Sequence, residues 1–249
     1  MNTSLFLNDT PPYQYNYVRR GQTLHWNGTD TLELYKKNLQ NNPTHEWLHK
    51  FGWIDSTIEY SYNIHGYRCK EFDSSPCALA LGCSFTEGVG LHLEQTWPHI
   101  LASKLDLTVW NLGVGGASID TVFRVLEHYI DRLNPKFIFL LIPPKERFEY
   151  CDIRDLFSII QPGRLGQHDS FAKEWLTQPF NSIYNTKKTM MAIEHMCAKS
   201  NVPLFSFPSQ GVIQRDLARD LMHPGELYQK HIADVMYSQH QKNIASSSQ

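Results

Sequence analysis

The fold is decided by the stretch Ala78-Leu79-Ala80-Leu81-Gly82-Cys83-Ser84-Phe85-Thr86-Glu87-Gly88, in which a short apolar run ends in a glycine-flanked polar turn. A continuous apolar run of this kind is typical of a parallel strand that helices cover on both faces. The turn that follows it places the hydroxyl of Ser84 at the carboxyl end of the predicted strand.

Three more apolar runs follow toward the C-terminus, at residues 108–110, 137–142 and 202–207. Longer segments of helical period separate them, and Gly, Pro or Asn marks each change of pattern. Four strands that alternate with helices predict an α/β domain of three layers, α/β/α, with a parallel sheet in the middle.

The helices of this domain can be placed in outline. Residues 118–134 put apolar side chains on one helix face, with Ser118 as the expected N-cap. Another helix is expected at about residues 181–200. The last should run from Pro224 to about residue 240, with Pro224 at the first helical position.

The first 70 residues have a different composition and predict an extension, residues 1–70, wrapped on a main domain of residues 71–249. Asp30 and Glu33 have the spacing of a capping box, and they predict one helix in this extension. The region is rich in aromatic residues: Tyr13, Tyr15, Tyr17, Trp26, Trp47, Trp53, Tyr60, Tyr62 and Tyr67. Packing is the favoured interpretation of these rings, and a platform for a sugar ring is the alternative.

Composition limits the classes of partner. The chain has 249 residues, a formal net charge of −2 and no run of five like charges, so neither nucleic acid nor a membrane is expected as a partner. Its longest apolar stretch, residues 137–142, is far below the roughly 20 residues that span a bilayer. The N-terminus lacks a signal-like pattern, which favours a cytoplasmic location. Five scattered cysteines suggest neither a disulfide framework nor a zinc site, and the oligomeric state stays open.

Three residues have the types and spacing of a nucleophile with its base and acid. Ser84 lies on a turn that exposes its hydroxyl and brings backbone N–H groups near it. Asp220 precedes His223 by three residues, so its carboxylate can accept the Nδ1 proton and leave Nε2 free to take a proton from serine. The loops after the first and last strands meet at one edge of a parallel sheet, so Ser84 and His223 are expected to meet there.

A glycine-rich segment follows the second strand: Asn111-Leu112-Gly113-Val114-Gly115-Gly116-Ala117-Ser118. Its backbone N–H groups face the same edge and can donate to an oxyanion. The segment also resembles a dinucleotide-binding loop, but the spacing G-x-G-x-x-G is not met, which leaves nucleotide binding as a minor alternative.

Together these blocks resemble the SGNH, or GDSL-type, hydrolase family over about residues 78–240. The resemblance implies a flavodoxin-like domain with Ser84 as nucleophile, Asp220 and His223 as acid and base, and the N–H groups of Gly116 and Ser84 as oxyanion donors. It implies no metal and no organic cofactor. The family's G-x-N-D block is replaced here by Ile142-Pro143-Pro144-Lys145-Glu146-Arg147-Phe148, so Lys145 or Arg147 stands in for the asparagine donor, or the donor is missing.

The function expected from this resemblance is hydrolysis of an acyl ester through a Ser-His-Asp triad. Acetyl groups on a glycan are one substrate typical of the family, and short-chain lipid-like esters are another, so the expected partner is a small-molecule or glycan ester. Two alternatives stay open: transfer of the acyl group to a sugar hydroxyl, and a non-catalytic binding or structural role for the scaffold.

Overall fold

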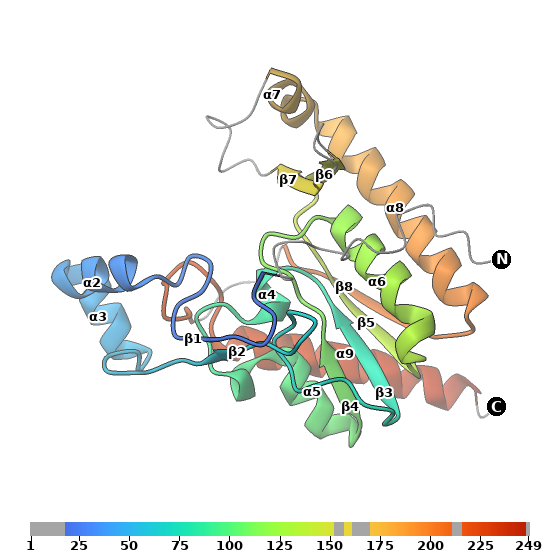
Figure 1. Cartoon of the computed structure of the whole chain (residues 1–249), viewed down its shortest axis with the longest axis horizontal. Coiled ribbons are helices and arrows are strands. Elements are labelled where there is room, and N and C mark those ends of the chain that lie inside the picture. Colours follow the sequence, from blue (N-terminus) through green and yellow to red (C-terminus); the bar gives the residue numbers. More distant parts are fainter. Residues whose placement is uncertain (1–17, 152–156, 161–169, 211–215, 248–249) are drawn as a thin grey trace.

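The computed structural model describes residues 18–151, 157–160, 170–210 and 216–247. A four-stranded sheet with the order β4-β3-β5-β8 lies at its centre (Figure 1). Its strands are β3 (Cys77–Leu81), β4 (Thr108–Asn111), β5 (Phe137–Ile142) and β8 (Leu204–Pro208). Each strand runs parallel to its neighbours. The four predicted strands and the parallel sheet are confirmed.

Helices cover both faces of this sheet (Figure 1). One face carries α5 (Trp97–Leu105) and α9 (Glu226–Ser247), and the other carries α6 (Ile119–Leu133) and α8 (Pro179–Lys199). Side chains of β3 alternate between the two layers: Leu79 belongs to the core under α6, and Ala78 to the core under α5 and α9. Both faces of the strand are therefore buried, which explains its continuous apolar run and confirms the three-layer α/β/α fold.

The helix α6 begins and ends close to the predicted bounds. Ser118 is its N-cap: the Ser118 hydroxyl accepts from the N–H of Thr121, and the Thr121 hydroxyl accepts from the N–H of Ser118. Asp120 lies in the first turn, where a negative charge complements the helix dipole. The helix ends at Asn134, which adopts a left-handed conformation. The expectation for Pro224 was wrong, because α9 begins at Glu226 and Pro224 forms a β-bridge with Leu217 instead.

The described part of the extension contains two short strands and two helices. The strands β1 (Thr23–Leu24) and β2 (Tyr60–Ser61) pair antiparallel, and α2 (Leu32–Gln40) packs against α3 (Asn42–Lys50). The sequence predicted one helix here, so α3 was missed.

The predicted capping box of Asp30 and Glu33 was also wrong. Thr31 is the N-cap of α2, and its hydroxyl accepts from the N–H of Leu34. Asp30 is 1% exposed and turns inward, where it pairs with Arg219. A buried carboxylate needs a charged partner, and Arg219 provides one at the cost of the expected cap.

Most of the described aromatic residues of the extension serve packing. Trp53, Tyr60, Tyr62 and Tyr67 are all at most 5% exposed. Trp26 is half-buried, and its ring is tilted by 42° relative to that of Tyr35, with centroids 5.6 Å apart, whereas Trp47 is exposed. Tyr13, Tyr15 and Tyr17 lie outside the described residues. The division of the chain near residue 70 stays a prediction.

An insertion follows β5. It contains the antiparallel strands β6 (Phe148–Cys151) and β7 (Phe157–Ile160) and the helix α7 (Ser170–Thr177). Glu149, at its base, accepts two hydrogen bonds of 2.7 Å from the guanidinium of Arg124 on α6. The N–H of Glu149 donates to Asp120 at 3.1 Å. The insertion is therefore fastened to the first turns of α6, next to the glycine-rich segment.

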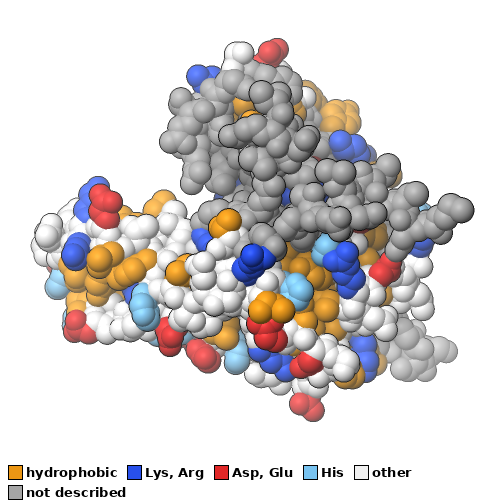
Figure 2. All heavy atoms as spheres, viewed as in Figure 1, with side chains coloured by type: hydrophobic (Ala, Val, Ile, Leu, Met, Phe, Trp, Pro, Cys, Tyr) orange, Lys and Arg blue, Asp and Glu red, His pale blue; other side chains and the backbone are white. Residues whose placement is uncertain are grey.

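Two short helical segments, α4 (Ser84–Glu87) and a 3-10 helix (Leu93–Gln95), complete the described elements. No described helix has the length and apolar character to cross a membrane. Acidic and basic side chains are intermixed on the visible face of the molecule (Figure 2). The cysteines at 69, 77, 83 and 197 carry free thiols.

Candidate active site

Ser84 lies at the carboxyl edge of the sheet, on the tight turn between β3 and α4. Cys83 has extended backbone and precedes the helix, so α4 begins at Ser84 itself. The helix ends one turn later at Gly88, whose φ is 80°. The first N–H groups of a helix have no intrahelical acceptors, so the turn leaves the amide of Ser84 available to a ligand.

The second part of the site is the loop between Ala218 and His223. The N–H of Ala218 donates to the carbonyl of His223 at 2.9 Å, and the N–H of Leu221 donates to the carbonyl of Ala218 at 2.8 Å. Leu221 adopts a φ of 54°, a left-handed conformation that costs a side chain about 1–2 kcal/mol. This tight loop brings the side chains of Asp220 and His223 together.

The three side chains form one continuous chain of hydrogen bonds. Nδ1 of His223 lies 2.6 Å from Oδ2 of Asp220, and Nε2 lies 2.8 Å from Oγ of Ser84. The ring of Phe85 meets the imidazole edge-on, with centroids 5.5 Å apart. Ser84 and His223 are 139 positions apart, and the loops after β3 and β8 bring them to the same edge of the sheet.

Asp220 is fully buried and accepts four hydrogen bonds. Oδ1 accepts from the N–H groups of Met222 at 3.0 Å and His223 at 2.9 Å. Oδ2 accepts from Nδ1 of His223 and, at 2.5 Å, from the hydroxyl of Thr29. Burial raises the pKa of this carboxyl, but the hydrogen bonds and the charge of His223, with the Thr29 hydroxyl, outweigh burial and lower the pKa below its usual value. Asp220 is therefore ionised where it holds His223.

The glycine-rich segment runs beside the nucleophile turn. The N–H of Val114 donates to the carbonyl of Gly82 at 3.1 Å. A Cβ on Gly113 would lie 2.4 Å from the backbone nitrogen of Glu87, so only glycine allows this approach to α4. Gly116 has a φ of 80° in a turn that the N–H of Ala117 closes on the carbonyl of Val114. Glycine is the residue that this turn position favours.

Lys145 and Arg147, the two cations of residues 142–148, lie in different surroundings. Lys145 is exposed in a turn after β5. Arg147 is half-buried, and its Nη1 donates to the carbonyl of Ala117 at 3.3 Å. Arg147 therefore contacts the backbone next to Gly116.

The sequence did not single out the buried polar residues that join the extension to this site. Glu87 is 0% exposed, and its Oε1 accepts from Arg19 at 3.0 Å, Asn27 at 2.9 Å and Tyr62 at 2.7 Å. Burial and the neighbouring Glu87 carboxylate raise the pKa of Tyr62, so its hydroxyl keeps the proton that it donates. The signal in the sequence was one charged residue, Glu87, in an otherwise uncharged block, residues 82–88.

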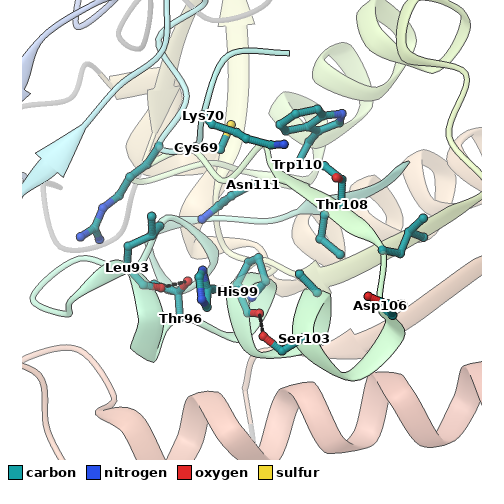
Figure 3. Close-up of a pocket in the computed structure, with 15 residues that line it drawn as sticks. Cys69, Lys70, Leu93, Thr96, His99, Ser103, Asp106, Thr108, Trp110 and Asn111 are labelled. Atoms are coloured by element: carbon teal, nitrogen blue, oxygen red, sulfur yellow. Dashed lines mark hydrogen bonds between the residues drawn. The ribbon is translucent and has the colours of Figure 1, made fainter. Parts of the chain in front are cut away.

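A cavity lies beside the edge strand β4 of the sheet (Figure 3). Its volume is about 590 Å³, and β4, α5 and the segment around Lys70 line it. Lys70 and His99 are exposed in its wall. Within the described residues, no group of three or more His, Cys, Asp or Glu side chains is arranged to hold a metal ion.

No protein-family model and no curated protein matches this chain. Among solved structures, it is similar to the esterase EstA of Pseudoalteromonas sp., with 18% identity, a TM-score of 0.39, and coverage of 68% of this chain and 98% of that one. It is also similar to a lipolytic protein of the G-D-S-L family from Veillonella parvula, with 11% identity, a TM-score of 0.35, and coverage of 66% and 97%.

A third similar structure is a family 3 carbohydrate esterase of Clostridium thermocellum, with 16% identity, a TM-score of 0.36, and coverage of 66% of this chain and 94% of that one. The similar structures are thus of the kind that the sequence resemblance suggested.

Proposed function

We propose that this protein is a serine esterase that hydrolyses an acyl ester, with an acetyl ester of a small molecule or a carbohydrate as the expected substrate. The observation that carries the proposal is the unbroken chain of hydrogen bonds from Ser84 through His223 to Asp220, with distances of 2.8 and 2.6 Å. A serine hydroxyl becomes a nucleophile when an oriented imidazole can take its proton.

In the proposed reaction, Oγ of Ser84 attacks the ester carbonyl while Nε2 of His223 takes the hydroxyl proton. The ionised Asp220 stabilises the imidazolium and keeps Nδ1 protonated. His223 then gives its proton to the leaving alcohol, and an acyl-enzyme remains. His223 then takes a proton from a water molecule, which attacks the acyl carbonyl, and the bond to Oγ of Ser84 breaks to release the carboxylic acid. His223 gives its proton to Oγ, which restores the Ser84 hydroxyl.

The oxyanion that forms at each attack needs donors that are already in place. We assign this role to the N–H groups of Ser84 and Gly116. The close packing of the glycine-rich segment on α4 supports the assignment, because it fixes both backbones relative to each other. Arg147, which contacts the carbonyl of Ala117, is the better placed of the two cations to supply a third donor.

A fluorophosphonate probe and p-nitrophenyl acetate test the proposal together. The parent protein should take up the label and hydrolyse the ester, and Ser84→Ala should lose both. Ser103→Ala removes an exposed hydroxyl on α5 and serves as the matched control, which should keep both. A folded parent that takes no label refutes the proposal, and a Ser84→Ala protein that still labels shows that another serine reacts.

A further inference from the structure

The turn of residues 27–30 in the extension lies directly against the proposed active site. Asn27 and Asp30 close it through two backbone hydrogen bonds of 2.9 and 3.0 Å. Thr29 lies in this turn, 191 positions before Asp220 in the sequence, and its hydroxyl donates to Oδ2 of Asp220 at 2.5 Å. The same hydroxyl oxygen lies 3.3 Å from Nδ1 of His223.

Buried contacts on both sides fix the position of Thr29. On one side, Asn27 donates to Glu87 on α4, the helix that begins at Ser84. On the other side, Asp30 accepts from Nε of Arg219 at 3.0 Å and from Nη2 at 2.7 Å, and Arg219 directly precedes Asp220. The turn therefore joins the loop of the nucleophile to the loop of the base.

The contact of Thr29 has a chemical consequence because it involves the oxygen that also holds His223. A hydrogen bond to a carboxylate stabilises its negative charge, so it lowers the affinity of the oxygen for a further proton. The hydroxyl also blocks rotation of the carboxylate, because each oxygen of Asp220 already has two donors. The imidazole is then held with Nε2 toward Ser84.

We propose that Thr29 is a positioning residue for the proposed ester hydrolysis, which sets the orientation and basicity of the Asp220–His223 pair from within the extension. This inference rests on the proposed function. It adds a residue of the extension to a machinery that otherwise comes from the loops of the sheet domain.

Other charged groups near the pair already have partners among the described residues. Asp30 is paired with Arg219, Glu87 with Arg19, and Glu226 with Lys230. The carboxylate of Asp216 accepts from the N–H of Leu227. None of these contacts includes Thr29, so we expect a change in the pH dependence of a variant without the Thr29 hydroxyl to report on Asp220 and His223.

The test compares Thr29→Val, which keeps the shape but removes the hydroxyl, with Thr29→Ser, which keeps the hydroxyl. Thr23→Val is the matched control, because the Thr23 hydroxyl on β1 pairs with the exposed hydroxyl of Ser61 at 3.2 Å. The measurements are kcat and KM for p-nitrophenyl acetate against pH, the rate of fluorophosphonate labelling, and thermal unfolding.

We expect Thr29→Val to lower kcat roughly tenfold with little change in KM, the size expected for one hydrogen bond to a charged group. The midpoint of the acid limb of kcat/KM should rise by about 0.5–1 pH unit. Without the Thr29 hydroxyl, the negative charge of Asp220 has one donor fewer, so the carboxylate attracts a proton on the neighbouring imidazole more strongly. Thr29→Ser should restore both values, and Thr23→Val should behave as the parent.

An active parent whose rate and pH profile are unchanged in Thr29→Val overturns the inference and leaves the proposed function standing. A loss of rate in Thr29→Val with an unchanged acid limb, or one that Thr29→Ser does not restore, also overturns it, because a merely structural contact would give that result. A parent with neither label nor turnover refutes the proposed function itself.

Discussion

Arg219→Met should greatly lower the free energy of unfolding, because the side chain of Arg219 joins the extension to the loop of Asp220. Methionine keeps much of the volume and removes every donor. The guanidinium makes two hydrogen bonds to Asp30 and one each to the carbonyls of Ser56, at 2.9 Å, and His25, at 2.8 Å. It also lies 4.1 Å from the ring centroid of Trp26.

The expected magnitude follows from the burial of the pair. The side chains of Arg219 and Asp30 are 2% and 1% exposed, so Arg219→Met leaves a buried carboxylate that keeps, among the described residues, only the hydroxyl of Tyr60 as a side-chain donor. Breaking a buried ion pair from one side costs about 3–5 kcal/mol of unfolding free energy. Lys230→Met is the matched control: it breaks an exposed pair with Glu226, so a far smaller loss of unfolding free energy is expected.

Urea unfolding followed by far-UV circular dichroism measures both variants. The double variant Arg219→Met with Asp30→Leu should be more stable than Arg219→Met alone, because it removes the unpaired buried charge. The reasoning fails if Arg219→Met loses no more unfolding free energy than Lys230→Met, or if the second substitution brings no recovery.

Two more predictions concern the altered block and the pH dependence of stability. Arg147→Met should lower kcat/KM roughly 10²-fold, because Arg147 contacts the glycine-rich segment. Lys145→Met should lower it less than about threefold, because Lys145 is exposed. Equal losses in the two variants would contradict the assignment of Arg147 as the third donor. Burial, with Arg132 and His65, lowers the pKa of His128 from 6.5 to about 4, so the unfolded chain binds more protons between these values and stability falls as the pH falls from 6.5 to 4. His128→Gln should lessen this loss in urea titrations at several pH values, and an unchanged pH dependence would contradict the prediction.

The sheet could be predicted from the sequence because its pattern is local. The two central strands, β3 and β5, are continuous apolar runs that end at Gly82 and Pro143, and α6 has both a periodic apolar face and a capping serine. The extension could not be predicted in the same way. Asp30 and Glu33 have the spacing of a capping box, but a tertiary ion pair with Arg219 outweighs a local cap.

The same distinction between local pattern and tertiary contact applies to the residues of the candidate site. Ser84, Asp220 and His223 could be named because each lies in a short block whose residue types and spacing suit the chemistry, and a parallel sheet brings the ends of its strands to one edge. Thr29, by contrast, is one of three threonines within residues 23–31, and no recognisable motif distinguishes it from the other two. Its contact with Asp220 depends on how the extension folds back, and no local pattern reports that.

The extension also affects the electrostatics of the proposed oxyanion site, because its Arg19 pairs with the buried Glu87. A Cβ on Gly115 would lie 2.8 Å from Oε2 of Glu87, so this buried carboxylate lies directly under the glycine-rich segment. An uncompensated negative charge there would oppose an oxyanion at Gly116. Arg19 supplies the compensating charge at 3.0 Å, with both side chains less than a tenth exposed. A boundary near residue 70, which composition predicts, therefore separates the carboxylate beneath the proposed oxyanion site from the cation that neutralises it.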